Sequence, residues 1–174
     1  MFSKIEKNPL LVLAVIAGGF IIFGYSTSLP KITDFMIFCI FVLGFDLIYG
    51  HMGQLSFGHM LYLGAGSYGT AIFANSVSPD PFLGIAVGIL TAALIALILG
   101  LVVVRTSGAC FALLNLALNE VGAFMVLVPF PEWTGGEDGL SLFFESYGFL
   151  DFANPTFLFF FVMASLLAVS YLIM

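Results

Sequence analysis

Charged residues are scarce in this 174-residue chain. Only 8% of the residues are Asp, Glu, Lys or Arg, against about a quarter in a typical soluble domain. Four Lys and Arg residues stand against ten Asp and Glu residues, so no basic surface for nucleic acid can be assembled. The two cysteines, Cys39 and Cys110, lie in separate apolar runs and supply neither a disulfide framework nor the spacing of a metal site.

Apolar residues are abundant instead. They make up 61% of the chain, 21 of them are phenylalanine, and the mean hydropathy is +1.18. This composition excludes disorder and leaves too little polar surface to cover a soluble globule. The apolar residues form long continuous runs, whereas a membrane β-barrel shows short alternating segments. The predicted class is therefore an all-α, polytopic membrane helix bundle.

Six apolar runs approach the roughly 20 residues that a spanning helix needs. The second run is short and interrupted by Asp46, and the third is rich in glycine, so these two are the weakest spans. A cleaved signal peptide is the alternative for the first run, but that run is long and five more follow it. The six predicted spans are residues 9–29, 35–49, 60–76, 82–104, 109–131 and 156–174.

The few cations predict an orientation. Lys4 and Lys7 precede the first span, and Arg105 follows the fourth. A cytoplasmic N-terminus places these three on the inside and leaves only Lys31 outside, as the positive-inside rule favours. The segment 132–155, which carries acids and no cation, is then an external loop.

The polar stretch 50–59 joins the two weak spans and contains three glycines. Non-helical backbone at membrane depth occurs only against protein or water, and transporters use interrupted helices to line substrate sites. The alternative is a simple cytoplasmic turn. We expect residues 53–59 to be irregular or a helix junction beside a translocation path, with Gln54, Ser56 and His59 as its polar groups.

Polar side chains also interrupt the fifth span. Glu120 lies at its centre, where an ionised acid costs about 2.5–3.5 kcal/mol on insertion scales, so we expect it to face the bundle interior. Asn115 and Asn119 are four residues apart and share a helix face, and Glu120 lies about 100° round from Asn119. These three residues either line a path or brace the helix packing.

Three ordered motifs resemble one family. They are Gly-Gln-Leu-Ser-Phe-Gly-His (53–59) with Gly-Ala-Gly-Ser-Tyr (64–68), Gly-Ala-Cys-Phe-Ala (108–112) leading into Asn-Leu-Ala-Leu-Asn-Glu (115–120), and Trp-Thr-Gly-Gly-Glu-Asp-Gly-Leu (133–140). Together they resemble the permeases of branched-chain amino acid ABC transporters over roughly residues 40–145. Asp46, His51 and Asn115 depart from the residues usual in that family, which bears on the substrate more than on the family.

The resemblance implies a set of partners. Such permeases act with a second permease subunit, two ATP-hydrolysing subunits and an external substrate-binding protein, in the plasma membrane of bacteria or archaea. They import leucine, isoleucine, valine or other amino acids, and close relatives import urea or short amides. No cofactor is expected in this chain. The glycines Gly135 and Gly136, with Asp138, predict an ordered external turn, which we expect to dock the binding protein or to close the outer gate.

Other classes of function fit less well. His51 and His59 are eight residues apart, and the chain has no His-Glu-x-x-His motif, no Gly-x-Ser-x-Gly elbow and no phosphate loop, so neither catalysis nor ATP binding is expected. A channel-forming or purely structural membrane subunit is the remaining rival. Transport stimulated by a binding protein and ATP would separate the permease from it.

Small residues recur every four positions in the fourth span. We expect residues 82–104 to form a straight helix that packs closely on a neighbour through this ridge, because small residues allow two backbones to approach; chance in a Gly- and Ala-rich lipid-facing span is the alternative. The ridge residues are Gly84, Gly88, Ala92, Ala96 and Gly100.

The last apolar run reaches Met174 without a flanking cation, although a last span usually ends in interfacial or basic residues. Members of the resembled family are longer. We therefore expect residues 1–174 to be the N-terminal part of a single permease domain, with a naturally short subunit completed by another chain as the alternative.

Overall fold

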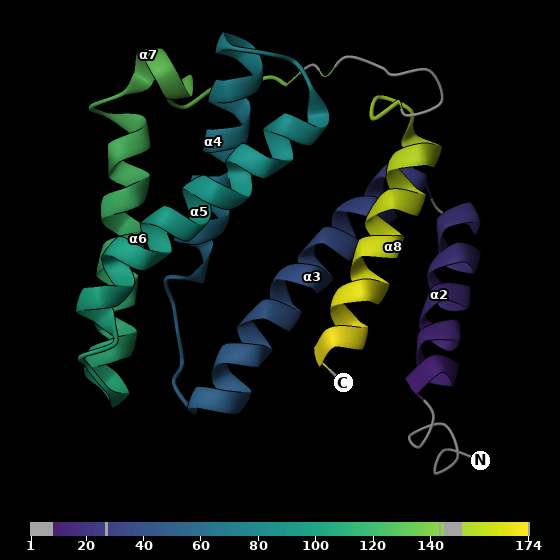
Figure 1. Ribbon diagram of the computed structural model, residues 1–174, viewed down its shortest axis with the longest axis horizontal. Coiled ribbons are helices and arrows are strands. Elements are labelled where there is room, and N and C mark those ends of the chain that lie inside the picture. Colours follow the sequence, from purple (N-terminus) through teal and green to yellow (C-terminus); the bar gives the residue numbers. More distant parts are fainter. Residues whose placement is uncertain (1–8, 27, 143, 145–150, 174) are drawn as a thin grey trace. The chain divides into compact units, whose positions relative to one another are not determined.

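The chain folds into helices (Figure 1). The structure is a computed structural model that describes residues 9–26, 28–142, 144 and 151–173. Across these residues there is no strand, which confirms the all-helical class. The helices are α2 (Pro9–Ser26), α3 (Leu29–Met52), α4 (His59–Ser76), α5 (Pro81–Val103), α6 (Gly108–Leu127), the four-residue α7 (Pro131–Thr134) and α8 (Pro155–Ile173).

Among the residues that the structure describes, four helices are long and apolar enough to cross a membrane, by length and composition: α3, α5, α6 and α8. α2 contributes a shorter apolar helix, Leu11–Gly24, and α4 carries the glycines that weakened its run. All six predicted spans thus correspond to helices, with shifted ends. Lys4 and Lys7, on which the predicted orientation rests, lie outside the described residues.

The prediction of a short, weak second span was wrong. α3 begins at Leu29 and provides a 22-residue candidate span, Leu29–Gly50. Lys31 and Asp34 broke the apolar run in the sequence, but they lie in the first two turns of the helix, where side chains can reach the membrane surface. Pro30 is compatible with the first turn, because the backbone N–H that it lacks has no helical partner there.

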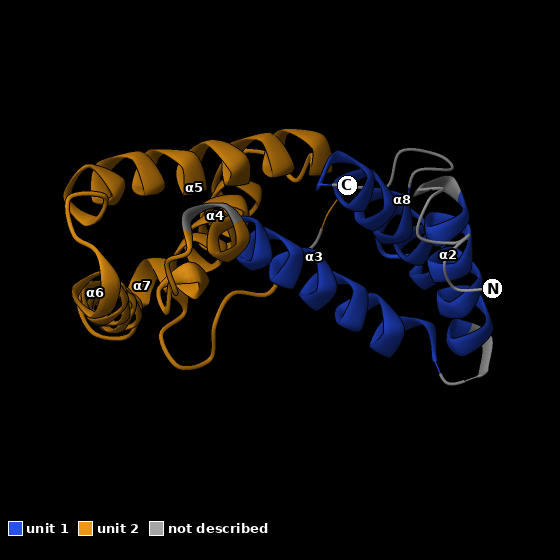
Figure 2. Ribbon diagram, turned by 90° about the horizontal axis from the view of Figure 1, so that it is seen from below, with its two compact units in different colours: residues 1–47, 146–174 blue, residues 48–145 orange. Residues whose placement is uncertain are grey.

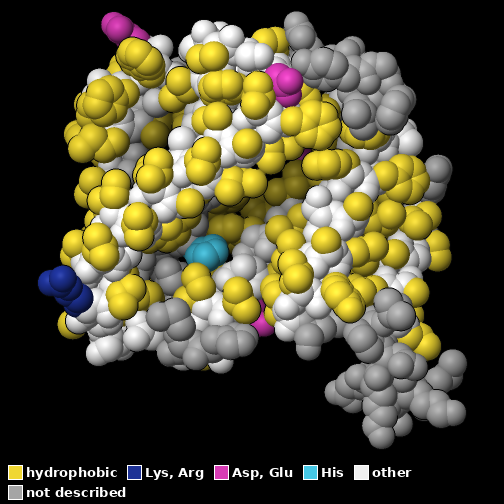
Figure 3. All heavy atoms as spheres, viewed as in Figure 1, with side chains coloured by type: hydrophobic (Ala, Val, Ile, Leu, Met, Phe, Trp, Pro, Cys, Tyr) yellow, Lys and Arg dark blue, Asp and Glu magenta, His cyan; other side chains and the backbone are white. Residues whose placement is uncertain are grey.

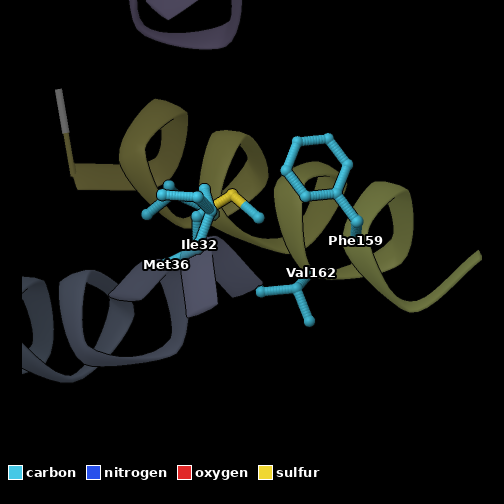
Figure 4. Packing of buried hydrophobic residues seen from close by; sticks show 5 residues of the cluster. Ile32, Met36, Phe159 and Val162 are labelled. Atoms are coloured by element: carbon cyan, nitrogen blue, oxygen red, sulfur yellow. The ribbon is translucent and has the colours of Figure 1, made fainter. Parts of the chain in front are cut away.

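Figure 2 shows two compact units, residues 1–47 with 146–174 and residues 48–145. In the first unit, α8 packs on α3, and Met36 and Phe159 are fully buried in the shared core (Figure 4). Gly24 brings α2 against the same core, since a Cβ there would lie 3.1 Å from the Phe159 ring. In a membrane such packing stabilises through van der Waals contact rather than through release of water.

In the second unit, Asp80 caps the N-terminus of α5, and α5 packs on α4. The Asp80 carboxylate accepts hydrogen bonds from the backbone N–H groups of Phe82 (2.8 Å) and Leu83 (3.2 Å), ahead of a helix that starts with Pro81. This is the arrangement expected at a helix N-terminus, where the first N–H groups have no helical partner.

The small-residue ridge of α5 meets α4 over its first half. Gly84 and Gly88 are buried, and the Thr70 hydroxyl donates to the Gly84 carbonyl oxygen at 3.0 Å. A Cβ on Gly88 would overlap the Thr70 hydroxyl and lie 3.0 Å from the Gly66 carbonyl oxygen. α5 therefore approaches α4 closely at Gly84 and Gly88, which is the kind of contact that the ridge predicts.

The other end of the ridge does not take part in this packing. A Cβ on Gly100 would meet nothing within 4 Å. A four-residue repeat exceeds the 3.6-residue turn, so the ridge drifts about 40° per step. Four steps separate Gly84 from Gly100, and by then the ridge has turned away from α4. The prediction that Gly100 belongs to the packed part of the ridge was wrong.

Candidate functional site

The backbone leaves the helical path between α3 and α4, as predicted. Residues 53–56 have no regular structure and residues 57–58 form a turn before α4 begins at His59. Gly53 has φ +62°, a left-handed conformation that glycine adopts without steric cost. Such backbone groups inside a membrane protein need protein or water around them.

This junction packs directly on α6. Gly58 is buried, and a Cβ there would lie 2.5 Å from the carbonyl oxygen of Asn115 and 3.0 Å from its Cβ. Asn115 is only 2% exposed, and its side-chain Nδ2 donates to the Phe111 carbonyl oxygen at 2.9 Å. Two of the motifs singled out in the sequence therefore touch, and the Asn115 amide binds its own helix.

The other polar residues of the junction are partly or wholly enclosed. Ser56 is 5% exposed. The Gln54 Oε1 atom is shielded from solvent and has no hydrogen-bond partner within the described part of the chain. A buried acceptor without a partner costs about 1–3 kcal/mol, so Gln54 is suited to receive a donor from a bound molecule. The half-buried His59 ring lies edge-on to Tyr62, with centroids 6.3 Å apart.

A pocket of about 680 Å³ lies between α4, α5 and α6. This volume is in the range of small-molecule sites, which are mainly apolar with a few polar groups. The polar side chains in its wall are Tyr68, Thr91 and Asn119. The lining consists of Met60, Leu61, Gly64, Ala65, Tyr68, Gly69, Ile72, Thr91, Ile95, Asn119, Gly122, Ala123, Met125, Val126 and Leu127.

The polar residues of α6 separate onto two faces. Asn119 lines the pocket and Asn115 meets the junction, but Glu120 is exposed on the surface of the chain. The expectation that Glu120 faces the interior was wrong for this chain by itself. Residues 115 and 119 share a face, whereas residue 120 lies about 100° round the helix, so a single narrow interface cannot hold all three.

The segment that follows α6 is an ordered turn. The Thr134 hydroxyl, 6% exposed, lies 2.6 Å from the Val126 carbonyl oxygen and 2.8 Å from that of Phe130, and it accepts the Gly136 N–H at 3.3 Å. Gly135 has φ +75° and Gly136 has φ +56°. Residues 131–136 thus form a hydrogen-bonded turn at the position where the sequence predicts one.

The same segment is tied to α4. The Asn75 side-chain Nδ2 donates to the Ser141 carbonyl oxygen at 3.2 Å. The Asp138 N–H donates to the Gly135 carbonyl oxygen at 3.2 Å, and the Asp138 side chain is exposed. Of the rest of the expected loop, residues 143 and 145–150 lie outside the described residues.

Sequence reasoning missed several residues that shape the site. Thr134 holds the turn through its hydroxyl, whereas the sequence prediction named Gly135, Gly136 and Asp138. Tyr68 and Thr91 supply polar atoms to the pocket wall. The signal for Thr91 was present: it lies three residues after Gly88 on the ridge, and its hydroxyl is 3.0 Å from the Gly88 carbonyl oxygen and 3.4 Å from that of Ala65 on α4.

The outside of the chain is apolar. Hydrophobic side chains cover most of the face in Figure 3, with few charged groups among them. Large residues such as Ile22 (74% exposed) and Leu97 (63% exposed) lie on helix surfaces, which a soluble monomer rarely tolerates in extended patches. Helices of spanning length with apolar outer faces define a multi-pass membrane protein.

Comparison with known proteins gives the family. Residues 27–174 match the family model for the branched-chain amino acid transport system / permease component, and the chain belongs to that family. No curated protein and no solved structure matches the chain. The resemblance seen in the three motifs is thereby confirmed at the level of the family.

Proposed function

We propose that this chain is a membrane-spanning permease subunit of an ATP-binding-cassette importer for branched-chain or other hydrophobic amino acids. The observation that carries the proposal is the pocket between α4, α5 and α6. Its wall is apolar except for three polar side chains, which suits a branched or aromatic side chain. Membership of a transport permease family supports the same role.

The path runs past the junction in this proposal. Gln54 and Ser56 lie within the junction, and His59 follows it directly. Asn119 lies in the pocket wall, and Asn115 packs against Gly58. The free acceptor of Gln54 is suited to the ammonium group of an amino acid, because hydrogen bonds to charged donors are the strong ones. The exposed Glu120 is assigned to the contact with a second permease subunit, because an acid facing lipid would be costly.

The family description, which is that of a component of a transport system, supports further partners in this proposal. We assign ATP hydrolysis to two partner subunits, and substrate delivery to an external binding protein in a bacterial or archaeal plasma membrane. The ordered turn with Gly135, Gly136 and Asp138 carries exposed acids at Glu132, Glu137 and Asp138. Such a charged surface fits the docking of the binding protein or the closing of an outer gate. In this proposal the N-terminus lies in the cytoplasm.

A urea or amide permease of the same family is the second candidate. Urea offers hydrogen-bond donors and an acceptor on every side, and burying such groups against apolar walls costs free energy. The apolar pocket therefore favours hydrophobic amino acids over urea. If the chain were a purely structural subunit, changes in the pocket would not alter uptake by the complex.

Uptake by the reconstituted complex tests the proposal. The complex contains this chain, its partner subunits and the binding protein, and receives radiolabelled leucine, phenylalanine or urea. Gly64→Leu adds a side chain to the pocket, because Gly64 lines it and a Cβ there meets nothing within 4 Å. Gly100→Leu is the matched control, since that position on α5 is equally open and is outside the pocket lining.

We expect leucine and phenylalanine uptake and little urea uptake. Gly64→Leu should reduce leucine uptake by about tenfold, because a filled pocket excludes the side chain, and Gly100→Leu should leave it unchanged. Preference for urea would favour the second candidate. Equal uptake by the two variants would overturn the assignment of the pocket, and absence of all uptake from the complete complex would overturn the permease function.

A further inference from the structure

A second hollow lies within the first unit, between α2 and α3. We call it the α2–α3 groove; its walls include Val15, Gly19 and Phe23 on α2 and Lys31 and Phe35 on α3, and its volume is about 630 Å³. Phe20 and Phe35 approach each other with ring centroids 6.2 Å apart. The walls are apolar except for Lys31, so the groove has one charged end.

The position of the groove along the helices matches one leaflet of a bilayer. Lys31 lies in the first turn of α3, where the candidate span Leu29–Gly50 begins. From Phe23 to Val15 the groove extends over eight residues of α2, roughly 12 Å at the rise of an α-helix. Half of the hydrocarbon core is about 15 Å thick. From these lengths we infer that the cation lies at headgroup level and the apolar walls at acyl-chain level.

The charge at the end of the groove is available. Within the described residues no hydrogen bond or ion pair holds Lys31, and its side chain is exposed. Asp34, the nearest acid along α3, is also exposed and is outside the groove lining. A single ammonium group above an apolar groove is complementary to a phosphate with acyl chains attached, since basic residues near a membrane surface attract anionic lipids.

We propose that the α2–α3 groove is a binding site for an anionic phospholipid. Its acyl chain lies along Val15, Gly19 and Phe35, and its phosphate lies at Lys31. The two parts make separate contributions: the groove selects for a lipid chain, and Lys31 selects for negative charge.

Lipid titration of the 174-residue chain tests both parts. The delipidated protein in mild detergent is titrated with phosphatidylglycerol or with phosphatidylcholine, and bound lipid is counted by native mass spectrometry. Lys31→Gln removes the charge, with Arg105→Gln as its control, because Arg105 is exposed and lies outside the groove. Gly19→Leu fills the groove, with Gly18→Leu as its control; a Cβ meets nothing within 4 Å at either glycine, and only Gly19 lines the groove.

We expect phosphatidylglycerol to bind more tightly than phosphatidylcholine. Lys31→Gln should weaken phosphatidylglycerol binding about fivefold, the effect of one basic residue near an anionic surface, and Arg105→Gln should not. Gly19→Leu should weaken both lipids, with helix content unchanged by circular dichroism. Equal affinities for the two lipids, equal losses in Lys31→Gln and Arg105→Gln, or full lipid binding by Gly19→Leu would each overturn the site. If Gly19→Leu bound lipid fully but assembled poorly with its partner subunits, the groove would be a contact for a partner helix and not a lipid site.

Discussion

Replacing Gly88 by isoleucine should loosen the contact between α4 and α5. Gly88 is buried, and the first carbon atom of any side chain would overlap the Thr70 hydroxyl and lie 3.0 Å from the Gly66 carbonyl oxygen. The hydroxyl can rotate, but Gly66 contributes backbone, so the two helices must separate. Separation also lengthens the 3.0 Å hydrogen bond from Thr70 to the Gly84 carbonyl oxygen.

The cost follows from these two effects. Overpacking of a tight interior contact costs about 1–3 kcal/mol. An interhelical hydrogen bond in a membrane protein contributes about 0.6 kcal/mol on average, and up to about 1.7 kcal/mol. We therefore expect Gly88→Ile to lower the unfolding free energy of the chain by about 2–3 kcal/mol, measured by titration with SDS in mixed micelles and followed by circular dichroism.

The control uses the same substitution on the same helix. Gly100→Ile meets open space and should change the unfolding free energy by less than about 0.5 kcal/mol. The double change Gly88→Ala with Thr70→Ala should cost less than the sum of its single changes, because Thr70→Ala removes the overlapping hydroxyl. Equal destabilisation by Gly88→Ile and Gly100→Ile would refute the reasoning.

Two further predictions concern the turn after α6 and the junction. Thr134→Val leaves the Gly136 N–H without its acceptor, a loss of about 1–3 kcal/mol, so hydrogen exchange in residues 131–142 should speed up about tenfold or more. Thr134→Ser keeps the hydroxyl and should exchange like the parent. If Thr134→Val exchanged at the parent's rate, the hydroxyl would not hold the turn. Gly58→Ala should lower the unfolding free energy by about 1–3 kcal/mol, because the new Cβ would meet the Asn115 backbone. Gly50→Ala, where a Cβ meets nothing within 4 Å, should not lower it. Equal stability of the two variants would show that the close approach of Gly58 to Asn115 is unimportant.

The class of the protein and the approximate positions of its long helices could be predicted from the sequence, apart from the start of α3. Long apolar runs and a lack of charge have one physical outcome, since only helices or closed barrels satisfy the backbone in lipid. The break in the helical path at residues 53–58 was also predictable, because local glycines such as Gly53 permit the conformation that it adopts. Likewise, the glycines after Thr134 predicted an ordered turn. These are local properties, and the chain carries them at the positions where they act.

The pairing of helices was decided only by the tertiary structure. The ridge on α5 predicted a close neighbour, and its four-residue repeat predicted a drift around the helix. Nothing in the repeat identified α4 as that neighbour or the residue at which the contact ends. Helical periodicity says which residues share a face and leaves open what covers that face. For the same reason the exposure of Glu120 could not be read from its place at the centre of a span.

The candidate site depends on those pairings. Gly58 and Asn115 are distant in sequence and touch because the junction packs on α6. The pocket exists because α4, α5 and α6 each contribute one wall, with Tyr68, Thr91 and Asn119 arriving from three different helices. The sequence by itself determined that the chain forms membrane helices and where the backbone leaves the helical path. The tertiary structure alone decided which of them meet, because contacts between helices depend on side-chain shape at positions far apart in the chain.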